Sequence, residues 1–234
     1  MKIKNILILV ILIVFIQGCM SSYKRYSIEE IQEKAILGDR ESQYRLAIFF
    51  EQNKNYSEAL KWYEKSASLA CVVSQNELGN IYKEHRLGLK QDYNKAIKYY
   101  EEASRNGYFD AINNLAYMHD LGLGIKQNRI KAVELYKIAA SKGSIRAMYN
   151  LGLSYIDGFD EIEKDFIQAY MWLDLARYYT GMSKDMTLKW SIRARLDELD
   201  RELTSKERSE AKGLASEWIR EQKNHSKNRI EDKI

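Results

Sequence analysis

Residues 111–143 read AINNLAYMHDLGLGIKQNRIKAVELYKIAASKG, and this stretch decides the fold. Leu115 and His119 are four residues apart, a spacing that places both side chains on one face of a helix. Ala132 and Tyr136 repeat the spacing after a loop that contains two glycines. Glycine at the end of a helical pattern is typical of a helix C-terminus. The stretch therefore predicts two helices joined by a glycine-containing connection.

The same pattern recurs along the chain with a period of about 36 residues, which is typical of helical repeat proteins. Two sets of equivalent positions show it: Leu46, Leu78, Leu115 and Leu151, followed by Ala59, Ala96, Ala132 and Ala169. One helix pair cannot bury its apolar face alone, so several pairs must stack to form a continuous core. Proline, the strongest helix breaker, does not occur among the 234 residues. We therefore predict an all-α fold, an α/α superhelix (solenoid) of stacked antiparallel helix pairs.

Small residues follow each leucine, and bulky ones occupy the second helix of each copy. The small residues are Ala47, Gly79, Ala116 and Gly152. The bulky pairs are Trp62 and Tyr63, Tyr99 and Tyr100, Leu135 and Tyr136, and Trp172 and Leu173. Glycine inside a helix costs about 1 kcal/mol relative to alanine, so its presence indicates a packing requirement. We expect neighbouring helices to approach closely at these small residues.

Helix-capping patterns mark both ends of the array. Ser27 to Glu30 has the sequence of a capping box and predicts a helix that stops before Gly38. Thr204 to Glu207 predicts the start of a last helix that ends at about Glu221. We expect residues 27–221 to form the repeat array with its capping helices. The polar residues 222–234 are expected to form a disordered tail.

The first residues are typical of a targeting signal. Lys2 and Lys4 precede an apolar run from Ile6 to Ile16, which is too short to span a bilayer as a helix. The run ends in Ile16-Gln17-Gly18-Cys19, which resembles a bacterial lipobox. The interpretation is a lipoprotein signal peptide at 1–18, a lipidated Cys19 and a linker at 19–26. A plain secretory signal with an incidental cysteine is the alternative.

This resemblance implies a location. Acyl chains on Cys19 would anchor the protein to a membrane of the cell envelope. Met20 follows the cysteine where lipoproteins retained at the inner membrane carry aspartate. The expected location is therefore the periplasmic face of the outer membrane. Cys71 is then the one cysteine left in the mature chain, and it has no internal partner for a disulfide.

The repeats resemble the Sel1-like repeat family, a relative of the tetratricopeptide repeat. One copy carries the elements of the family pattern at Ala111, Leu115-Ala116, Gly122-Leu123-Gly124, Lys131-Ala132, Ala139-Ala140 and Gly143. The first copy departs from the pattern, with the short Gln52–Tyr56 connection in place of the glycine loop. The resemblance covers roughly residues 28–221 and implies a general interaction scaffold. It implies a protein or peptide partner, no cofactor and no enzymatic activity.

In tetratricopeptide relatives the first helix of each pair lines the concave face, which suggests where a partner would bind. Positions −2, +2 and +5 from the leucine should face that groove. The candidate partner-binding residues are Tyr44, Asn76, Asn80, Lys83, Asn113, Tyr117 and Tyr149. Asparagine can hydrogen-bond an extended backbone, and tyrosine is a frequent anchor at interfaces. The alternative is that these are ordinary solvated helix residues.

Other patterns with chemical potential are explained by the repeat. Gly122-Leu123-Gly124 does not follow a strand and lacks the third glycine of a phosphate loop. His85, His119 and His225 have no metal-ligand spacing, and His119 takes an aromatic position of its copy, which favours a packed side chain. The net charge of +4 and the absence of a basic block interleaved with aromatics give no indication of nucleic-acid binding.

Three functions are compatible with a lipid-anchored repeat array. The first is a non-enzymatic scaffold or adaptor of the envelope. The second is an immunity lipoprotein that neutralises a secreted effector toxin of the phospholipase type, because some Sel1-like lipoproteins resemble partners of such effectors. The third is a β-lactamase-like hydrolase, for which Ser209 and Lys212 supply an isolated Ser-x-x-Lys pattern without its companion motifs. The first is the function that we predict.

Overall fold

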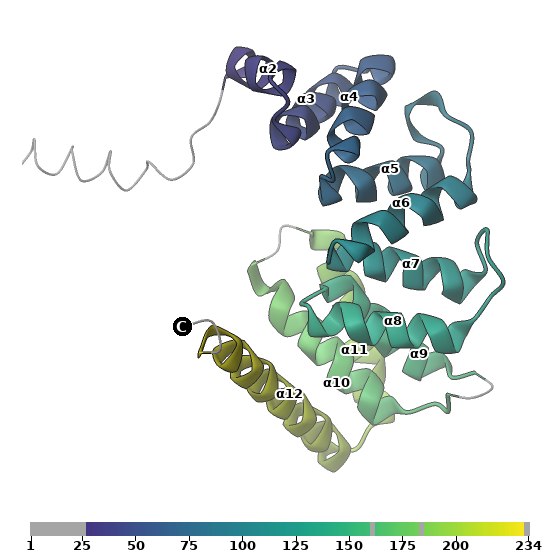
Figure 1. Ribbon diagram of the computed structural model, residues 1–234. Helices are drawn as coiled ribbons and strands as arrows, with labels where there is room; N and C mark the ends of the chain where they lie inside the picture. Colours follow the sequence, from purple (N-terminus) through teal and green to yellow (C-terminus); the bar gives the residue numbers. More distant parts are fainter. Residues whose placement is uncertain (1–26, 160–161, 183–184, 232–234) are drawn as a thin grey trace, which may run out of the picture.

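The computed structural model describes residues 27–159, 162–182 and 185–231, and this part of the chain is a stack of helices (Figure 1). Signal peptide, Cys19 and linker, all expected within residues 1–26, lie outside the described residues. The four helix pairs are α3 (Arg40–Gln52) with α4 (Tyr56–Ser68), α5 (Val72–Glu84) with α6 (Tyr93–Arg105), α7 (Phe109–Leu121) with α8 (Arg129–Ser141), and α9 (Ile145–Asp157) with α10 (Phe166–Tyr179). Helix α2 (Ile28–Ile36) precedes the first pair, and α11 (Met186–Glu202) and α12 (Ser205–Glu231) follow the last. Two short 3-10 helices, η1 (Arg86–Gly88) and η2 (Thr180–Met182), lie in the connections.

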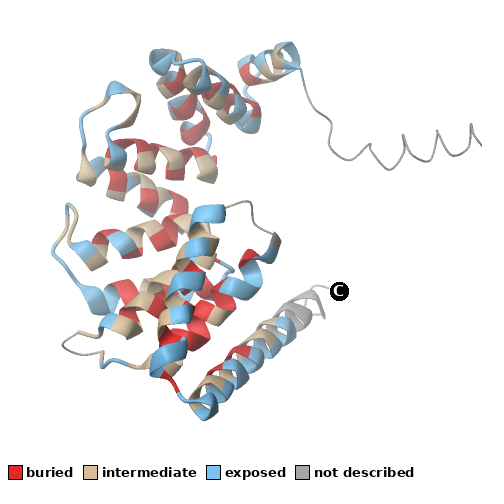
Figure 2. Cartoon of the chain, turned by 180° about the vertical axis from the view of Figure 1, so that it is seen from behind, coloured by how far each residue is buried: buried red, intermediate tan, exposed pale blue. Residues whose placement is uncertain are grey.

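The pairs stack one on the next, so the predicted all-α superhelix is confirmed. The two helices of each pair contact each other most extensively, and the second helix of each pair contacts the first helix of the next. Figure 1 shows this succession from α3 and α4 to α9 and α10, with α11 and α12 closing the end. Buried residues lie mainly where helices face one another (Figure 2).

The core is built from the residues that the repeat predicted. Tyr63, Tyr100 and Tyr136 are among the largest fully buried side chains. A Cβ atom at Gly79 would lie 2.4 Å from the Tyr100 ring, and one at Gly152 would lie 2.6 Å from Cγ of Leu173. Both distances are much shorter than the van der Waals separation of two carbon atoms. The predicted close approach of helices at these glycines is therefore confirmed.

The capping patterns act as expected at both ends of the array. Ser27 and Glu30 form a reciprocal capping box at the start of α2. Thr204 and Glu207 exchange the equivalent bonds at the start of α12. Between the last repeat and α12 lies α11, which was not anticipated from the sequence. Asp185 caps α11 through Leu188 N.

The structure differs from the sequence-based expectation at the C-terminus. The polar residues after Glu221 were expected to be disordered, yet α12 continues to Glu231. Their composition explains the difference, because lysine, glutamate, glutamine and arginine are good helix formers. Neither proline nor glycine occurs after Gly213 to stop the helix.

Candidate functional site

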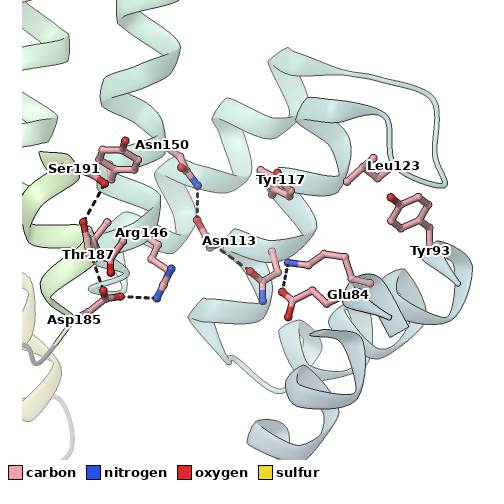
Figure 3. A pocket seen from close by; sticks show the side chains of 14 residues that line it. Glu84, Tyr93, Asn113, Tyr117, Leu123, Arg146, Asn150, Asp185, Thr187 and Ser191 are labelled. Atoms are coloured by element: carbon pink, nitrogen blue, oxygen red, sulfur yellow. Dashed lines mark hydrogen bonds and ion pairs between the residues drawn. The ribbon is translucent and has the colours of Figure 1, made fainter. Parts of the chain in front are cut away.

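A groove of about 810 Å³ lies against the first helices of three consecutive repeats (Figure 3). Residues of α5, α7 and α9 contribute most of its lining, α11 with its N-cap contributes a further wall, and Tyr93 of α6 and Leu123 complete it. Side chains from elements far apart in the sequence, such as Glu84 and Ser191, therefore line one cavity. The volume is in the range of typical ligand sites.

Four of the seven candidate residues line this groove, namely Lys83, Asn113, Tyr117 and Tyr149. Tyr117 is 38% exposed, which leaves its ring accessible to a partner. Lys83 approaches the Tyr117 ring, with its ammonium 5.6 Å from the centroid, and pairs with Glu84 at 3.2 Å. These sequence-based positions therefore converge on one cavity.

The other three candidates do not line the groove. Asn76 is 7% exposed, and its side-chain oxygen accepts a hydrogen bond of 2.9 Å from Asn114. The side-chain oxygen of Asn80 accepts a bond of 2.8 Å from the buried Tyr100 hydroxyl. The side-chain oxygens of these two asparagines are therefore engaged within the protein. Tyr44 lies in the first repeat, where its ring packs at 6.0 Å from that of Tyr63.

A chain of side-chain amides connects the repeats along the groove. Asn150 of α9 donates to Asn113 of α7 at 3.1 Å, and Asn113 approaches its neighbour Asn114 at 3.5 Å. Asn114 then donates to Asn76 of α5. In both bonds between repeats, the donor belongs to the later repeat and the acceptor to the earlier one. Asn114 and Asn150, which both line the groove, were missed because only positions −2, +2 and +5 from each leucine were expected to face it.

The wall from α11 was also missed. Asp185, Thr187, Leu188 and Ser191 all line the groove. Asp185 pairs with Arg146 of α9 at 2.7 Å, so the start of α11 is tied to the last repeat. The sequence signal was the apolar spacing of Ile192, Leu196 and Leu199, which are buried. That spacing predicts a helix but not the surface against which the helix folds.

A charged cluster around Arg86 of η1 connects the first repeat to the second. Arg86 contacts Glu51 of α3 and pairs with Glu77 of α5 at 2.5 Å. The Tyr63 hydroxyl donates to Glu51 at 2.7 Å. Burial lowers the pKa of Arg86, but its bonds to the two glutamates outweigh burial and raise the pKa above the usual value. Burial, followed by the nearby Glu77, raises the pKa of Tyr44.

His119 and Cys71 are both packed against neighbouring residues of the repeat array. His119 lines a second cavity with Lys126 and Arg129, and its Nδ1 is buried with no hydrogen-bond partner among the described residues. Burial and then Lys131 lower the pKa of His119.

Cys71 is free and 9% exposed at the N-cap of α5. Burial raises the pKa of the Cys71 thiol, but hydrogen bonds, chiefly with Ser66 and Ser74, lower it below the usual value.

The remaining motifs also have positions set by the repeat. Gly122 ends α7 in the left-handed conformation, and a Cβ at Gly124 would lie 2.5 Å from Tyr93 Cβ in the preceding repeat. The glycine loop therefore packs against the preceding repeat. Ser209 and Lys212 lie on the exposed surface of α12, as predicted for a solvated helix face.

Metal clusters and membrane-spanning helices are both missing from the described part of the chain. Its residues contain no group of three or more histidine, cysteine, aspartate or glutamate side chains that could hold a metal ion. Among the described helices, none combines the length and apolar character needed to cross a membrane.

Solved structures of other proteins are similar in fold to this chain, and two of them show the extent of the similarity. One is a protective antigen of uropathogenic Escherichia coli with an SLR fold, at 24% identity and a TM-score of 0.57, covering 88% of this chain and 50% of the antigen. The other is a Sel1 repeat protein from Oxalobacter formigenes, at 24% identity and a TM-score of 0.60, covering 74% of this chain and 75% of that protein. This chain thus spans half the length of the Escherichia coli antigen. No curated protein matches the chain.

The Sel1 repeat model matches four consecutive stretches, residues 40–71, 72–108, 109–144 and 145–178. Each stretch contains one helix pair of the structure. The matches continue without a gap over more than half of the chain. The chain therefore belongs to the Sel1 repeat family, whose members are generally protein-interaction scaffolds.

Proposed function

We propose that this protein is a non-enzymatic scaffold, anchored in the bacterial envelope, that holds a segment of another protein in the groove between α5, α7, α9 and α11. The observation that carries the proposal is the groove itself, because amides and tyrosines from three consecutive repeats line one cavity. Tyrosine is enriched at sites that dominate binding energy. A cavity assembled from several repeats is a surface that a single helix pair cannot provide.

The proposed anchor is a lipid on Cys19. Support comes from the basic start, the apolar run and the string Ile16-Gln17-Gly18-Cys19. A single acyl chain holds a protein only weakly, whereas two or more give stable attachment. In this proposal the groove faces the periplasm from the outer membrane, and its partner is another envelope or imported protein.

Site-specific photocrosslinking in the native host tests the groove. Tyr117 is replaced by p-benzoylphenylalanine, and the matched control carries the same replacement at Ile138 of α8, which is 45% exposed and outside the groove lining. We expect a discrete crosslinked protein for the Tyr117 variant only. Adding Lys83→Glu should weaken that crosslink, because it reverses a charge in the groove wall.

The outcomes separate the possible functions. Equal crosslinking from both positions, or none from Tyr117, would contradict groove binding. A resident envelope protein in the crosslink supports the scaffold function. A secreted phospholipase in its place would instead identify an immunity protein.

A further inference from the structure

A second cavity, of about 700 Å³, is lined by residues of the third and fourth repeats. The lining comes from α7, from the connection between α7 and α8, from the start of α8 and from the residues that follow α9. It shares no residue with the lining of the groove. This cavity is therefore a separate site, and the proposed function does not depend on it.

Two cationic side chains, Lys126 and Arg129, line the second cavity, and none of its described lining residues is acidic. Lys126 is exposed and forms no ion pair with another described residue. Nε of Arg129 lies 3.8 Å from Oδ1 of Asp120, which is longer than a charge-assisted hydrogen bond. The described residues therefore leave most of the positive charge at this cavity uncompensated.

The groove differs from the second cavity in its charge balance. Lys83 lies 3.2 Å from Glu84, and Arg146 lies 2.7 Å from Asp185. Both carboxylates line the groove together with their cationic partners. An anion entering the groove would have to displace one of these carboxylates. The second cavity offers its cations without an acidic lining residue among those described, so it is the better site for an anion.

The uncharged polar residues of the second cavity add hydrogen-bond donors. The side-chain oxygen of Asn128 accepts the backbone N–H of Lys131 at 2.9 Å, which leaves the two N–H groups of its amide. Gln127 donates one N–H to the backbone oxygen of Asp120 at 2.7 Å and retains the other. Nδ1 of His119, another lining residue, has no hydrogen-bond partner within the described ranges. Residues 127 and 128 thus supply donors directly between the two cationic residues.

Arg129 is held in place by the fourth repeat. Its guanidinium carbon lies 5.4 Å from the centroid of the Phe159 ring, which is a cation–π contact. Phe159 in turn exchanges two backbone hydrogen bonds with Ile162, of 2.7 and 2.6 Å. One of the two cations is therefore ordered before a ligand arrives, which lowers the entropic cost of binding.

A phosphate group matches these donors better than a carboxylate does. A phosphate monoester presents three strong acceptor oxygens, whereas a carboxylate presents two. The guanidinium of Arg129 can bond two oxygens at once, which leaves a third for Lys126 or the Asn128 amide. Arg129 also begins α8, whose first turn contains no acidic residue, so the positive end of the helix adds to the attraction.

We propose that the second cavity is a phosphate-binding site, in which Lys126 and Arg129 bind a phosphate group carried by a free phosphate ester or by a lipid head group. The Asn128 amide supplies a further hydrogen bond. Gly122 and Gly124 do not line the cavity, so the site differs from a glycine-rich phosphate loop. The protein would then bind a phosphate ligand in addition to the partner in its groove.

NMR titration of the purified, ¹⁵N-labelled protein with inorganic phosphate at constant ionic strength tests the site. We expect saturable shifts of backbone amide signals that are confined to residues 126–130 and 158–159. The double change Lys126→Gln with Arg129→Gln should weaken phosphate binding by at least about tenfold, because it removes both cations.

A matched double variant controls for the loss of net charge. Arg105→Gln with Lys142→Gln removes the same charge from exposed positions outside the cavity and should leave phosphate affinity unchanged. Equal thermal unfolding midpoints of both double variants and the parent would show that the fold is intact. Equal weakening of phosphate binding in the two variants would overturn the proposal, because net charge alone would then explain the binding.

A second titration, with glycerophosphoglycerol, distinguishes the two sources of phosphate. This compound is the head group of phosphatidylglycerol without its acyl chains. Tighter binding of glycerophosphoglycerol than of inorganic phosphate supports a lipid head group, and the reverse order supports a free phosphate ester. An absence of saturable shifts with both compounds, or shifts centred on other residues, would refute a phosphate site in this cavity.

Discussion

At the scale of single residues, two glycines of the same chain have opposite roles. Gly79 lies inside α5 against the buried ring of Tyr100, whereas Gly213 lies inside α12, where an added Cβ atom would meet nothing within 4 Å. The Tyr100 ring cannot move aside easily, because it is fully buried and its hydroxyl donates to Asn80. The role of a helical glycine therefore depends on its neighbours in space.

The two glycines provide a matched pair of substitutions. Gly79→Ala should lower the free energy of unfolding by about 1–3 kcal/mol, because overpacking forces the core apart. Gly213→Ala should raise it by up to about 1 kcal/mol, since alanine is the better helix former. Urea unfolding, monitored by circular dichroism, measures the free energy of unfolding of both variants. A neutral or stabilising effect of Gly79→Ala would contradict the close packing at this position.

His119 makes stability depend on pH. Its folded-state pKa lies below the usual 6.5, chiefly because of burial. As the pH falls below 6.5, the unfolded chain therefore binds a proton before the folded protein does, and stability decreases. His119→Tyr places the residue found at the equivalent Tyr82 and Tyr155 and removes this contribution.

Urea unfolding at pH 7 and pH 5 measures the effect. We expect the parent protein to lose more stability over this interval than the His119→Tyr variant. Other titrating groups are common to both proteins, so they cancel in the comparison. Identical losses would show that burial of His119 does not affect its protonation.

At the scale of elements, the η1 connection joins the first two repeats through Arg86. His85 and Leu87, the residues on either side of Arg86, have positive φ values of 65° and 54°. Such conformations cost about 1–3 kcal/mol each in residues other than glycine. The contacts of Arg86 with Glu51 and Glu77 offset this cost and connect α3 to α5.

Replacement of Arg86 should loosen this junction. Arg86→Met leaves two partly buried carboxylates without their cation, and we expect a loss of about 1–3 kcal/mol, less than for a fully buried pair. Arg193→Met is the control, because Arg193 is 75% exposed and pairs weakly with Asp197 at 3.8 Å. It should change stability by about 0.5 kcal/mol or less.

Chemical denaturation compares the two arginine variants, and hydrogen exchange locates the change. Faster exchange in α2 to α5 of the Arg86 variant, with α7 to α10 unaffected, is the expected pattern, since repeats contact only their neighbours. Equal stability of both variants would contradict the role given to Arg86.

At the scale of the whole molecule, one end of the array builds the binding surface and the other is expected to lead to the membrane. Helix α11 follows the last repeat and returns to line the groove with α9. The proposed lipid site precedes α2 by a short linker. Attachment and binding would thus be separate functions of the two ends.

This separation can be tested by changing Cys19. In cells grown with radiolabelled palmitate, the parent protein should become labelled and sediment with membranes. Cys19→Ser should abolish the label and release the protein, because the acyl chains supply the membrane affinity. Cys71→Ser serves as the control and should retain both properties. Labelling of the Cys19→Ser variant would contradict lipidation at this residue.

Much of the fold was predictable from the sequence because it depends on local periodicity. Spacings of three and four residues identify helix faces, and the repeated leucines and alanines align the copies. The buried tyrosines, the glycines at helix contacts and both capping boxes follow from the same patterns. The C-terminal limit of α12 was placed too early, because polar composition was taken as disorder where helix propensity prevailed.

The candidate site was predicted only in part. Lys83, Asn113, Tyr117 and Tyr149 were found by counting from the leucines, since position in a repeat determines the direction of a side chain. Asn76 and Asn80 fell on the same positions, but hydrogen bonds from Asn114 and the Tyr100 hydroxyl engage their side-chain oxygens within the protein. Periodicity gives direction and does not reveal such partners.

By itself, the sequence determined the helices of the four repeats, their pairing and the face of each repeat that is expected to bind, because all of these follow from spacings within about 40 residues. Only the tertiary structure decided where the groove begins and ends. Arg86 connects Glu51 of the first repeat to Glu77 of the second, and α11 lines the groove beside α9. Both depend on contacts between side chains distant in sequence, whose approach is set by the packing of the array and not by any local pattern.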